Sequence, residues 1–212
     1  MEFELDLLNI ARRLPALVDE QERKASTSTG AVSLSRQAAA RAINEGHLVS
    51  AIRLLDAATV QAQRSGTTDQ AAQLAEDAAM IADYIDRRDA ARRWGELADA
   101  STLPRARWQF RMKQAHSLYP WPEEAEEIYR NEVIPESEGS ENLAASQLAL
   151  GQFLLRTGTR QGDMDAVQRS IDALEAALGA QAGENQRPYI ESLLVEAREF
   201  MVGADGPSTN HQ

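Results

Sequence analysis

The sequence of 212 residues contains no cysteine, which excludes disulfide bonds and thiolate chemistry. Aromatic residues make up only 5% of it, and this scarcity argues against a core built from β-strands. The formal net charge of −11 argues against a nucleic-acid-binding groove, because phosphate binding depends on a concentrated basic surface. The chain is instead rich in alanine and leucine, which suit closely packed helices.

Long apolar runs are also missing. No run approaches the roughly 18 residues that a membrane-spanning helix requires. The first residues are acidic, whereas a secretory signal begins with positive charge. These two observations predict a cytoplasmic protein that does not bind membranes. Only Lys24 and Lys113 are lysines among the 22 basic residues, a bias typical of a GC-rich bacterial genome.

A pattern of small and apolar residues occurs twice, 40 residues apart. These residues recur before and after a turn, at the spacing that two antiparallel helices need where their backbones approach closely. The pattern predicts an all-α fold made of helical hairpins. The first copy is Ala39, Ala42, Gly46, Ala51, Leu55 and Ala58, and the second is Ala79, Ala82, Asp86, Ala91, Gly95 and Ala98.

The segment from Gly46 to Ala58 resembles the second helix of a tetratricopeptide repeat (TPR). The signature of that family has a turn glycine, a small alanine, a large apolar residue and a second alanine at this spacing. The equivalent alanines of four successive hairpins are Ala51, Ala91, Ala125 and Ala166. Their separations are 40, 34 and 41 residues, against a family period of about 34. The resemblance covers residues 32–178 and implies a TPR-like α-solenoid of antiparallel helical hairpins, wound into a right-handed superhelix.

The third hairpin departs most from the pattern. It has Lys113 and His116 where the first hairpin has Ala39 and Ala42, and it has Glu132 in the position of Ala58. The early tryptophan of the family is also missing from its slot in every hairpin. A generic helical-hairpin protein outside the family therefore stays an alternative.

Amphipathic patterns divide the chain into three parts. Residues 1–31 are predicted to form an N-terminal amphipathic helix and a linker rich in serine and threonine. Residues 32–202 are predicted to form the helical repeat domain, whose last helix caps the stack. Residues 203–212 have no apolar pattern and are predicted to be a disordered tail. The N-terminal helix can fold back on its own array or dock on a second copy, so a homo-oligomer formed through this helix is left open.

If the array follows the family, the first helix of each hairpin lines a concave groove. Helical wheels turned inward place a mixture of apolar and charged side chains on this surface, which suits a peptide or a helix. The apolar members can instead fill the cores of the hairpins, and this alternative stays open. The predicted partner-binding residues are Arg36, Ile43, Glu76, Met80, Asp83, Phe110 and Gln114.

Two further features are candidate contacts. Trp121 lies in Tyr119-Pro-Trp-Pro122, a stiff turn where a tryptophan either contacts a partner or pins the turn against its own helices. Seven arginines form a basic concentration. It either holds an acidic partner or, through interleaved carboxylates such as Asp89 and Glu96, forms a salt-bridged, solvated face, which is the interpretation that the sequence favours. These arginines are Arg87, Arg88, Arg92, Arg93, Arg105, Arg107 and Arg111.

The sequence predicts no catalytic site, no metal site and no cofactor. It has no phosphate-binding loop, no serine-centred elbow and no His-Glu-x-x-His pattern. Paired carboxylates such as Glu123 and Glu127 are typical of a solvated helix face. We therefore expect a non-catalytic protein–protein interaction module, an adaptor, scaffold or chaperone-like protein that binds a peptide or helix of a partner protein. The alternative is a regulatory or sensory helical domain that binds a small molecule between its helices.

Overall fold

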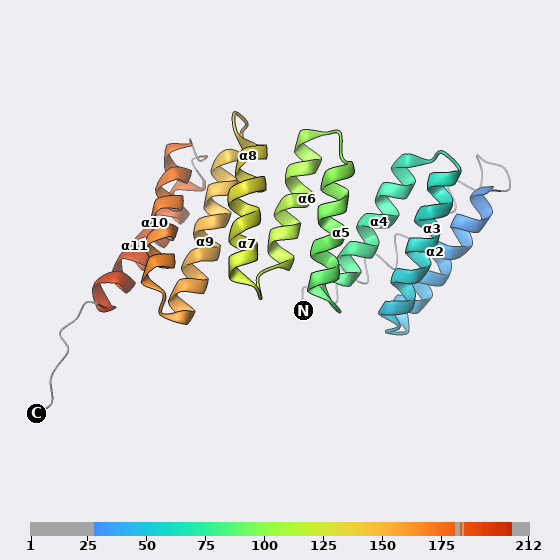
Figure 1. Ribbon diagram of the computed structural model, residues 1–212, viewed down its shortest axis with the longest axis horizontal. Coiled ribbons are helices and arrows are strands. Elements are labelled where there is room, and N and C mark those ends of the chain that lie inside the picture. The colour runs from blue at the N-terminus through green and yellow to red at the C-terminus, as the bar shows by residue number, and fades with distance from the viewer. Residues whose placement is uncertain (1–27, 181–182, 184, 205–212) are drawn as a thin grey trace, which may run out of the picture. The chain divides into compact units, whose positions relative to one another are not determined.

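The computed structural model describes residues 28–180, 183 and 185–204, and the regular structure in this part of the chain is helical throughout (Figure 1). The prediction of an all-α fold is confirmed for these residues. Within the same ranges, no helix combines the length and the apolar character needed to cross a membrane. The predicted N-terminal helix lies outside the described residues, and so does the predicted tail beyond Ala204.

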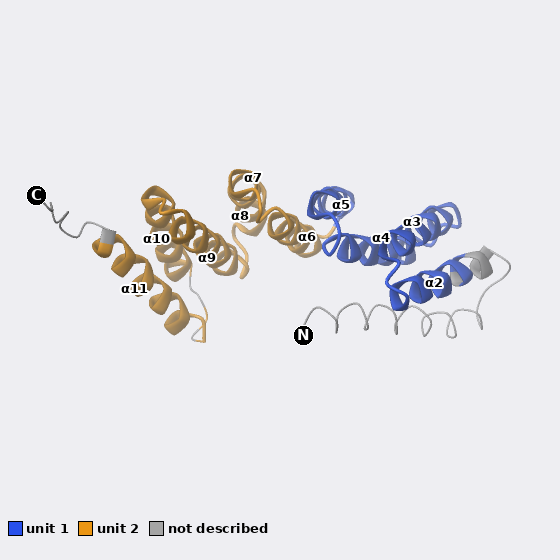
Figure 2. Ribbon diagram, turned by 90° about the horizontal axis from the view of Figure 1, so that it is seen from below, with its two compact units in different colours: residues 1–102 blue, residues 103–212 orange. Residues whose placement is uncertain are grey.

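The chain divides into two compact units, residues 1–102 and residues 103–212 (Figure 2). The sequence predicts one helical domain over residues 32–202, and the division falls inside that range. In each unit, helices that follow one another along the chain pack against one another.

In unit 1, α3 packs between α2 and α4, and α4 also contacts α5 (Figures 1 and 2). The buried side chains of this unit are mostly alanines, joined by a few larger residues such as Leu55, Leu74 and Ile81. Alanine lets two helix backbones approach closely, which explains how a core with so few large side chains stays packed. The helices are α2 (Ser28–Asn44), α3 (Leu48–Arg64), α4 (Thr68–Ala82) and α5 (Arg87–Ala100).

Two devices make the turns of unit 1. Gly46 follows α2 and Gly66 follows α3, with φ angles of +77° and +73°. Glycine adopts this left-handed conformation without the strain that a side chain would add. The turn before α5 instead uses Asp86, whose carboxylate accepts hydrogen bonds from the backbone N–H groups of Arg88 at 3.0 Å and Asp89 at 3.1 Å. Gly46 and Asp86, which the sequence predicts to be equivalent, therefore both lie in turns but shape them differently.

Unit 2 begins with α6, which packs on a longer helix made of three consecutive segments. Next come the hairpin of α9 and α10 and then α11, which contacts both of them. The elements are α6 (Pro104–Ser117), α7 (Pro122–Ile128), η1 (Tyr129–Val133), α8 (Ile134–Ser137), α9 (Leu143–Gln161), α10 (Met164–Gly179) and α11 (Arg187–Ala204).

The α9–α10 hairpin is packed closely through two glycines of α9. A Cβ atom added at Gly151 would lie 2.7 Å from the side chain of Leu174, and one added at Gly158 would lie 2.8 Å from Cγ2 of Val167. The hydroxyl of Ser170 also donates a hydrogen bond to the carbonyl oxygen of Gly151 at 2.7 Å. Any side chain larger than hydrogen at these two positions would push the helices apart.

The helix from α7 to α8 widens into a π-helix at η1. The backbone N–H of Ile134 donates a hydrogen bond to the carbonyl oxygen of Tyr129, five residues earlier. In an α-helix the acceptor would be the carbonyl oxygen four residues earlier. Pro135 follows directly. Because proline has no N–H group and its ring crowds the carbonyl four residues before it, a wider turn at this point relieves the crowding.

The π-helix changes which residues of α7 and η1 face the core. In α3, the residues four and seven positions after Ala51 are buried. After Ala125 of α7, the buried residues are Tyr129 and Val133, four and eight positions later. The prediction that Glu132 takes the position of Ala58 is therefore corrected to Val133. Glu132 instead accepts a salt bridge from Nε of Arg111 at 2.6 Å.

The four alanines that the sequence aligns are all buried, with exposed fractions between 0 and 4%. Each lies on the second helix of a consecutive pair, where a close helix contact requires a small residue. They are Ala51 in α3, Ala91 in α5, Ala125 in α7 and Ala166 in α10.

Several element ends differ from the predicted ones. Helix α2 begins at Ser28, inside the predicted linker, and α11 continues through Gly203 to Ala204. Helix α9 runs to Gln161, because the left-handed residue that ends it is Gly162, with φ of +69°.

Candidate functional site

A cavity of about 390 Å³ lies in unit 2, between the start of α7 and the α9–α10 hairpin. We call it the α7–α10 pocket. One wall is the turn from Pro120 to Glu124 together with Glu126 of α7. The opposite side comes from α9 and from the N-terminal part of α10. Exposed side chains at its edge, including Glu123 and Gln161, leave the pocket open to solvent.

The floor of the pocket is apolar. Phe153 and Leu154 of α9 are buried, and Ala166 of α10 is buried beside them. Behind the floor, the ring of Phe153 packs on Tyr119 and Tyr129, with ring centroids 4.9 and 5.8 Å apart. This aromatic cluster fixes the position of the Phe153 ring and thereby the shape of the floor.

The two tyrosines of this cluster are tied to each other. Their hydroxyl oxygens lie 3.5 Å apart, at the outer limit of a hydrogen bond. Burial raises the pKa of both Tyr119 and Tyr129, since the charged phenolate is disfavoured away from water. Both hydroxyls are therefore neutral at physiological pH, and the aromatic side of the pocket carries no charge.

Trp121 takes part in its turn through its backbone and lines the pocket with its side chain. Its backbone N–H donates to the carbonyl oxygen of Leu118 at 2.7 Å, which closes the turn after α6. Its side chain is half-buried and lines the pocket. The prolines on either side restrict the backbone, so the indole is held at the pocket wall at little entropic cost.

The charged groups of the pocket are held by specific contacts. Arg169 of α10 donates to both carboxylate oxygens of Glu126, at 3.1 and 3.2 Å, and Arg130 donates to the same carboxylate at 2.8 Å. The carboxylate of Asp163 accepts a hydrogen bond from the backbone N–H of Ala166 at 3.0 Å and caps α10. The pocket wall therefore contains an ion pair that joins α7 to α10.

The predicted partner-binding residues of unit 1 have different environments. Arg36 and Ile43 of α2 are buried, with exposed fractions of 2 and 7%. Glu76 and Met80 of α4 are half-buried, and Met80 packs against the core of the unit. Asp83, directly after α4, is also half-buried and accepts a hydrogen bond from the indole of Trp94 in α5 at 3.0 Å. Arg36 and Ile43 are therefore buried within unit 1 and do not line an open groove.

The remaining two predicted residues lie in α6 of unit 2. Phe110 is half-buried, and the ammonium group of Lys113 lies 5.7 Å from the centre of its ring. Gln114 is half-buried and accepts a hydrogen bond from Arg111 at 2.8 Å. Neither residue lines the α7–α10 pocket.

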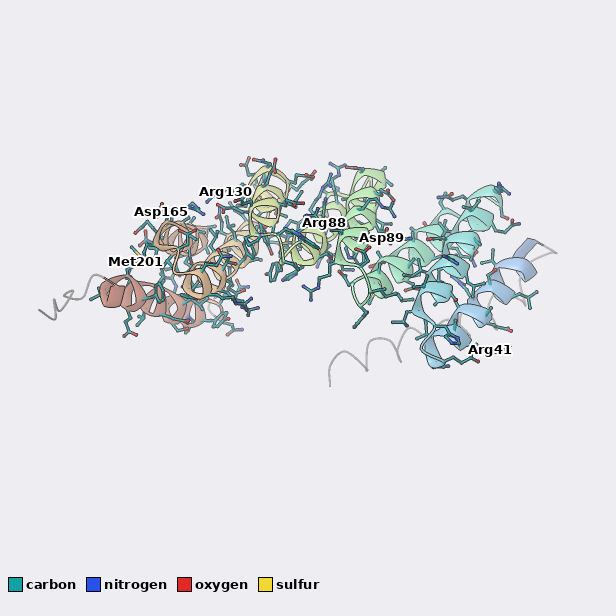
Figure 3. All side chains as sticks on the ribbon, turned by 60° about the horizontal axis from the view of Figure 1, so that its bottom comes forward. Arg41, Arg88, Asp89, Arg130, Asp165 and Met201 are labelled. Carbon is teal, nitrogen blue, oxygen red and sulfur yellow. The ribbon has the colours of Figure 1, made fainter. Side chains whose placement is uncertain are left out.

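Carboxylates surround part of the basic concentration, as predicted. Arg93 makes two hydrogen bonds to Asp56 of α3, at 2.7 and 2.9 Å, and one to Asp89, at 2.7 Å. Figure 3 labels Asp89 and its neighbour Arg88 on α5. Arg92 pairs with Asp89 and Glu96. These contacts join α3 to α5 and raise the pKa of Arg93, chiefly through its bonds to Asp56.

Sequence reasoning singled out Trp121 but missed most of the pocket. Phe153 and Arg169 look like ordinary core and surface residues of their helices. Only the approach of α7, α9 and α10 brings them together with the Trp121 turn. Among the residues that the structure describes, no group of three or more His, Cys, Asp or Glu side chains is arranged to hold a metal ion.

The described chain is thus an all-helical protein in which consecutive helices pack together, with a mixed aromatic and acidic pocket in its second unit. No family model, curated protein or solved structure matches it. The resemblance to the tetratricopeptide family therefore depends on the residues of the sequence alone.

Proposed function

We propose that this chain is a non-catalytic protein–protein interaction module, built as a TPR-like α-solenoid, which binds a peptide or helix of a partner protein. The observation that carries the proposal is the α7–α10 pocket. It combines a buried apolar floor, an aromatic wall held by a stiff turn and a charged rim. Surfaces of this kind take single anchor side chains from a bound segment.

The half-buried residues predicted for the groove are additional proposed contacts, considered within each unit by itself. Glu76 and Met80 offer a charged and an apolar group on α4 of unit 1, and Phe110 and Gln114 offer an apolar and an uncharged polar group on α6 of unit 2. Asp83 lies directly after α4 but also holds Trp94 in place. Arg36 and Ile43 are assigned to the core and are left out of the proposed surface.

A second candidate function is binding of a small molecule, which would make the chain a regulatory or sensory domain. A volume of about 390 Å³ falls within the range of small-ligand sites, which are mostly apolar with a few placed polar groups. The same pocket would serve in that case, so the two candidates differ in the size of the ligand rather than in its location.

Site-specific photo-crosslinking in the cells that produce the protein distinguishes these candidates. A photoreactive amino acid in place of Trp121 should capture a protein partner. The same amino acid in place of the exposed Val202 of α11 serves as a control for chance collisions. A partner captured from position 121 and lost on competition with the unlabelled chain supports the interaction module. Capture at neither position, together with specific stabilisation by a metabolite in a thermal-shift screen, would favour the small-molecule domain instead.

A further inference from the structure

The side chains that line the α7–α10 pocket include more negative than positive groups. Its lining contains four carboxylates, those of Glu123, Glu124, Glu126 and Asp163, and one guanidinium, that of Arg169. The guanidinium is committed to Glu126 through two hydrogen bonds. A bound anion would therefore meet an excess of negative charge, whereas a bound cation would meet complementary charge.

The four carboxylates differ in their exposure to solvent. Glu126, which pairs with Arg169 and Arg130, and Asp163, which caps α10, are half-buried. Glu123 and Glu124 lie exposed at the mouth of the pocket, in the first turn of α7. They are placed to meet a charged group that enters from solvent.

Below these carboxylates the pocket is apolar and aromatic. Phe153 and Leu154 form the floor, and the indole of Trp121 forms part of the wall. A ligand that satisfies both regions has an apolar stem and a cationic end. Lysine and arginine side chains have this structure, and their charged ends are also attracted to the faces of aromatic rings.

We propose that the α7–α10 pocket binds an organic cation, an ammonium or guanidinium group carried on an alkyl stem. In the complex that the proposed function calls for, this group is a lysine or arginine side chain of the partner segment. That the cation belongs to a partner protein rests on the proposed function. That the ligand is a cation on an alkyl stem rests on the residues of the pocket alone.

The test uses the full chain and the indole signals of its three tryptophans in ¹H–¹⁵N NMR spectra. The signal of Trp121 is assigned by its loss in Trp121→Phe. Acetylated and amidated Gly-Arg-Gly should shift this signal on titration and leave that of Trp94, in unit 1, unchanged. The matching peptide with norleucine has a stem without charge and should bind roughly tenfold more weakly or worse. Equal binding of the two peptides, or no binding of the arginine peptide, would overturn the proposal.

Variants of the rim give an independent measurement. Glu123→Gln together with Glu124→Gln should weaken binding of the arginine peptide by about tenfold, and added salt should weaken wild-type binding as well. The control pair, Glu138→Gln with Glu141→Gln, removes the same charge from exposed positions outside the pocket and should leave the affinity unchanged. The same loss of affinity in both pairs would show a general charge effect and contradict a specific cation site.

Ethylguanidinium separates the two sources of the cation. Tighter binding of the peptide than of ethylguanidinium points to a protein segment. Equal binding points to a free organic cation, which supports the pocket chemistry but contradicts the interaction module. If a partner is crosslinked at position 121 but the arginine and norleucine peptides bind equally, the proposed function holds and the cation inference fails.

Discussion

The indole Nε1 of Trp94 donates a hydrogen bond to Oδ2 of Asp83 across 3.0 Å, joining α5 to the residue that follows α4. Trp94 is almost completely buried, whereas Asp83 is only half-buried. A carboxylate that accepts a bond from a buried indole has a packing role. Asp83 is thus both a predicted partner contact and a fixed part of unit 1.

Substitution of Trp94 by Phe should lower the free energy of unfolding by about 2–3 kcal/mol, since the hydrogen bond is lost and a cavity replaces part of the buried indole. Urea denaturation followed by circular dichroism measures the change. Asp83→Asn is the matched control, because its side-chain oxygen can still accept from the indole. A larger loss for Asp83→Asn than for Trp94→Phe would show that Asp83 stabilises the unit by another contact.

Ala51→Leu and Ala91→Leu should each destabilise the protein by about 1–3 kcal/mol, because the close helix contacts cannot admit three more carbon atoms. Both alanines are buried in unit 1. Ala57→Leu adds the same volume at an exposed position of α3 and should change the melting temperature far less. Equal melting temperatures for all three variants would mean that these helices can separate freely.

Gly158→Ala should destabilise the protein by roughly 1–3 kcal/mol, because the new Cβ would lie 2.9 Å from the carbonyl oxygen of Asp163, which is backbone and cannot move aside cheaply. Gly179→Ala, at the end of α10, meets no atom within 4 Å and should be neutral or slightly stabilising. Thermal unfolding compares the two variants. If Gly158→Ala were as stable as Gly179→Ala, the α9–α10 packing described above would be incorrect.

The ion pairs of Asp89 make part of the stability of unit 1 depend on pH. Burial alone would raise the pKa of Asp89, but hydrogen bonds from Arg93 and Arg92 outweigh it and hold the pKa below its ordinary value of 3.8. The charged form is thus favoured in the folded state, and its stabilisation is present at neutral pH and lost as the pH falls below about 4.

Asp89→Asn should accordingly lower the free energy of unfolding by about 0.5–1 kcal/mol at pH 7 and by less at pH 3. Urea denaturation at the two pH values measures the difference. Glu141→Gln, at an exposed position of unit 2, serves as the control and should have little effect at either pH. An equal loss for Asp89→Asn at both pH values would show that its ion pairs do not stabilise the fold.

Helical periodicity predicted much of the fold because the helices bury one face at regular spacing. It placed the helix pairs of both units and the buried alanines Ala51 and Ala91 correctly. It placed helix ends less well, since a local pattern does not show which glycine adopts a left-handed conformation. Gly162 ends α9, whereas Gly158, four residues earlier, lies inside the helix.

The candidate site was harder to predict, because its residues are brought together by packing between helices. Trp121 stood out by its proline neighbours, but nothing in the local sequence connects it to Phe153 or Arg169. A helical wheel also cannot tell an inward-facing groove from a core. Arg36 was assigned to a groove on this basis, yet its side chain is buried.

The π-helical turn at Tyr129–Val133 has a consequence for the alignment of this chain with itself and with other proteins. An alignment of the third hairpin with the first without gaps is shifted by one residue after this turn, and it places Glu132 opposite Ala58. With a one-residue gap inside this turn, Val133 takes that place, and the mismatch at that position becomes an insertion. An alignment that allows this gap keeps the buried positions of η1 in step with those of α3.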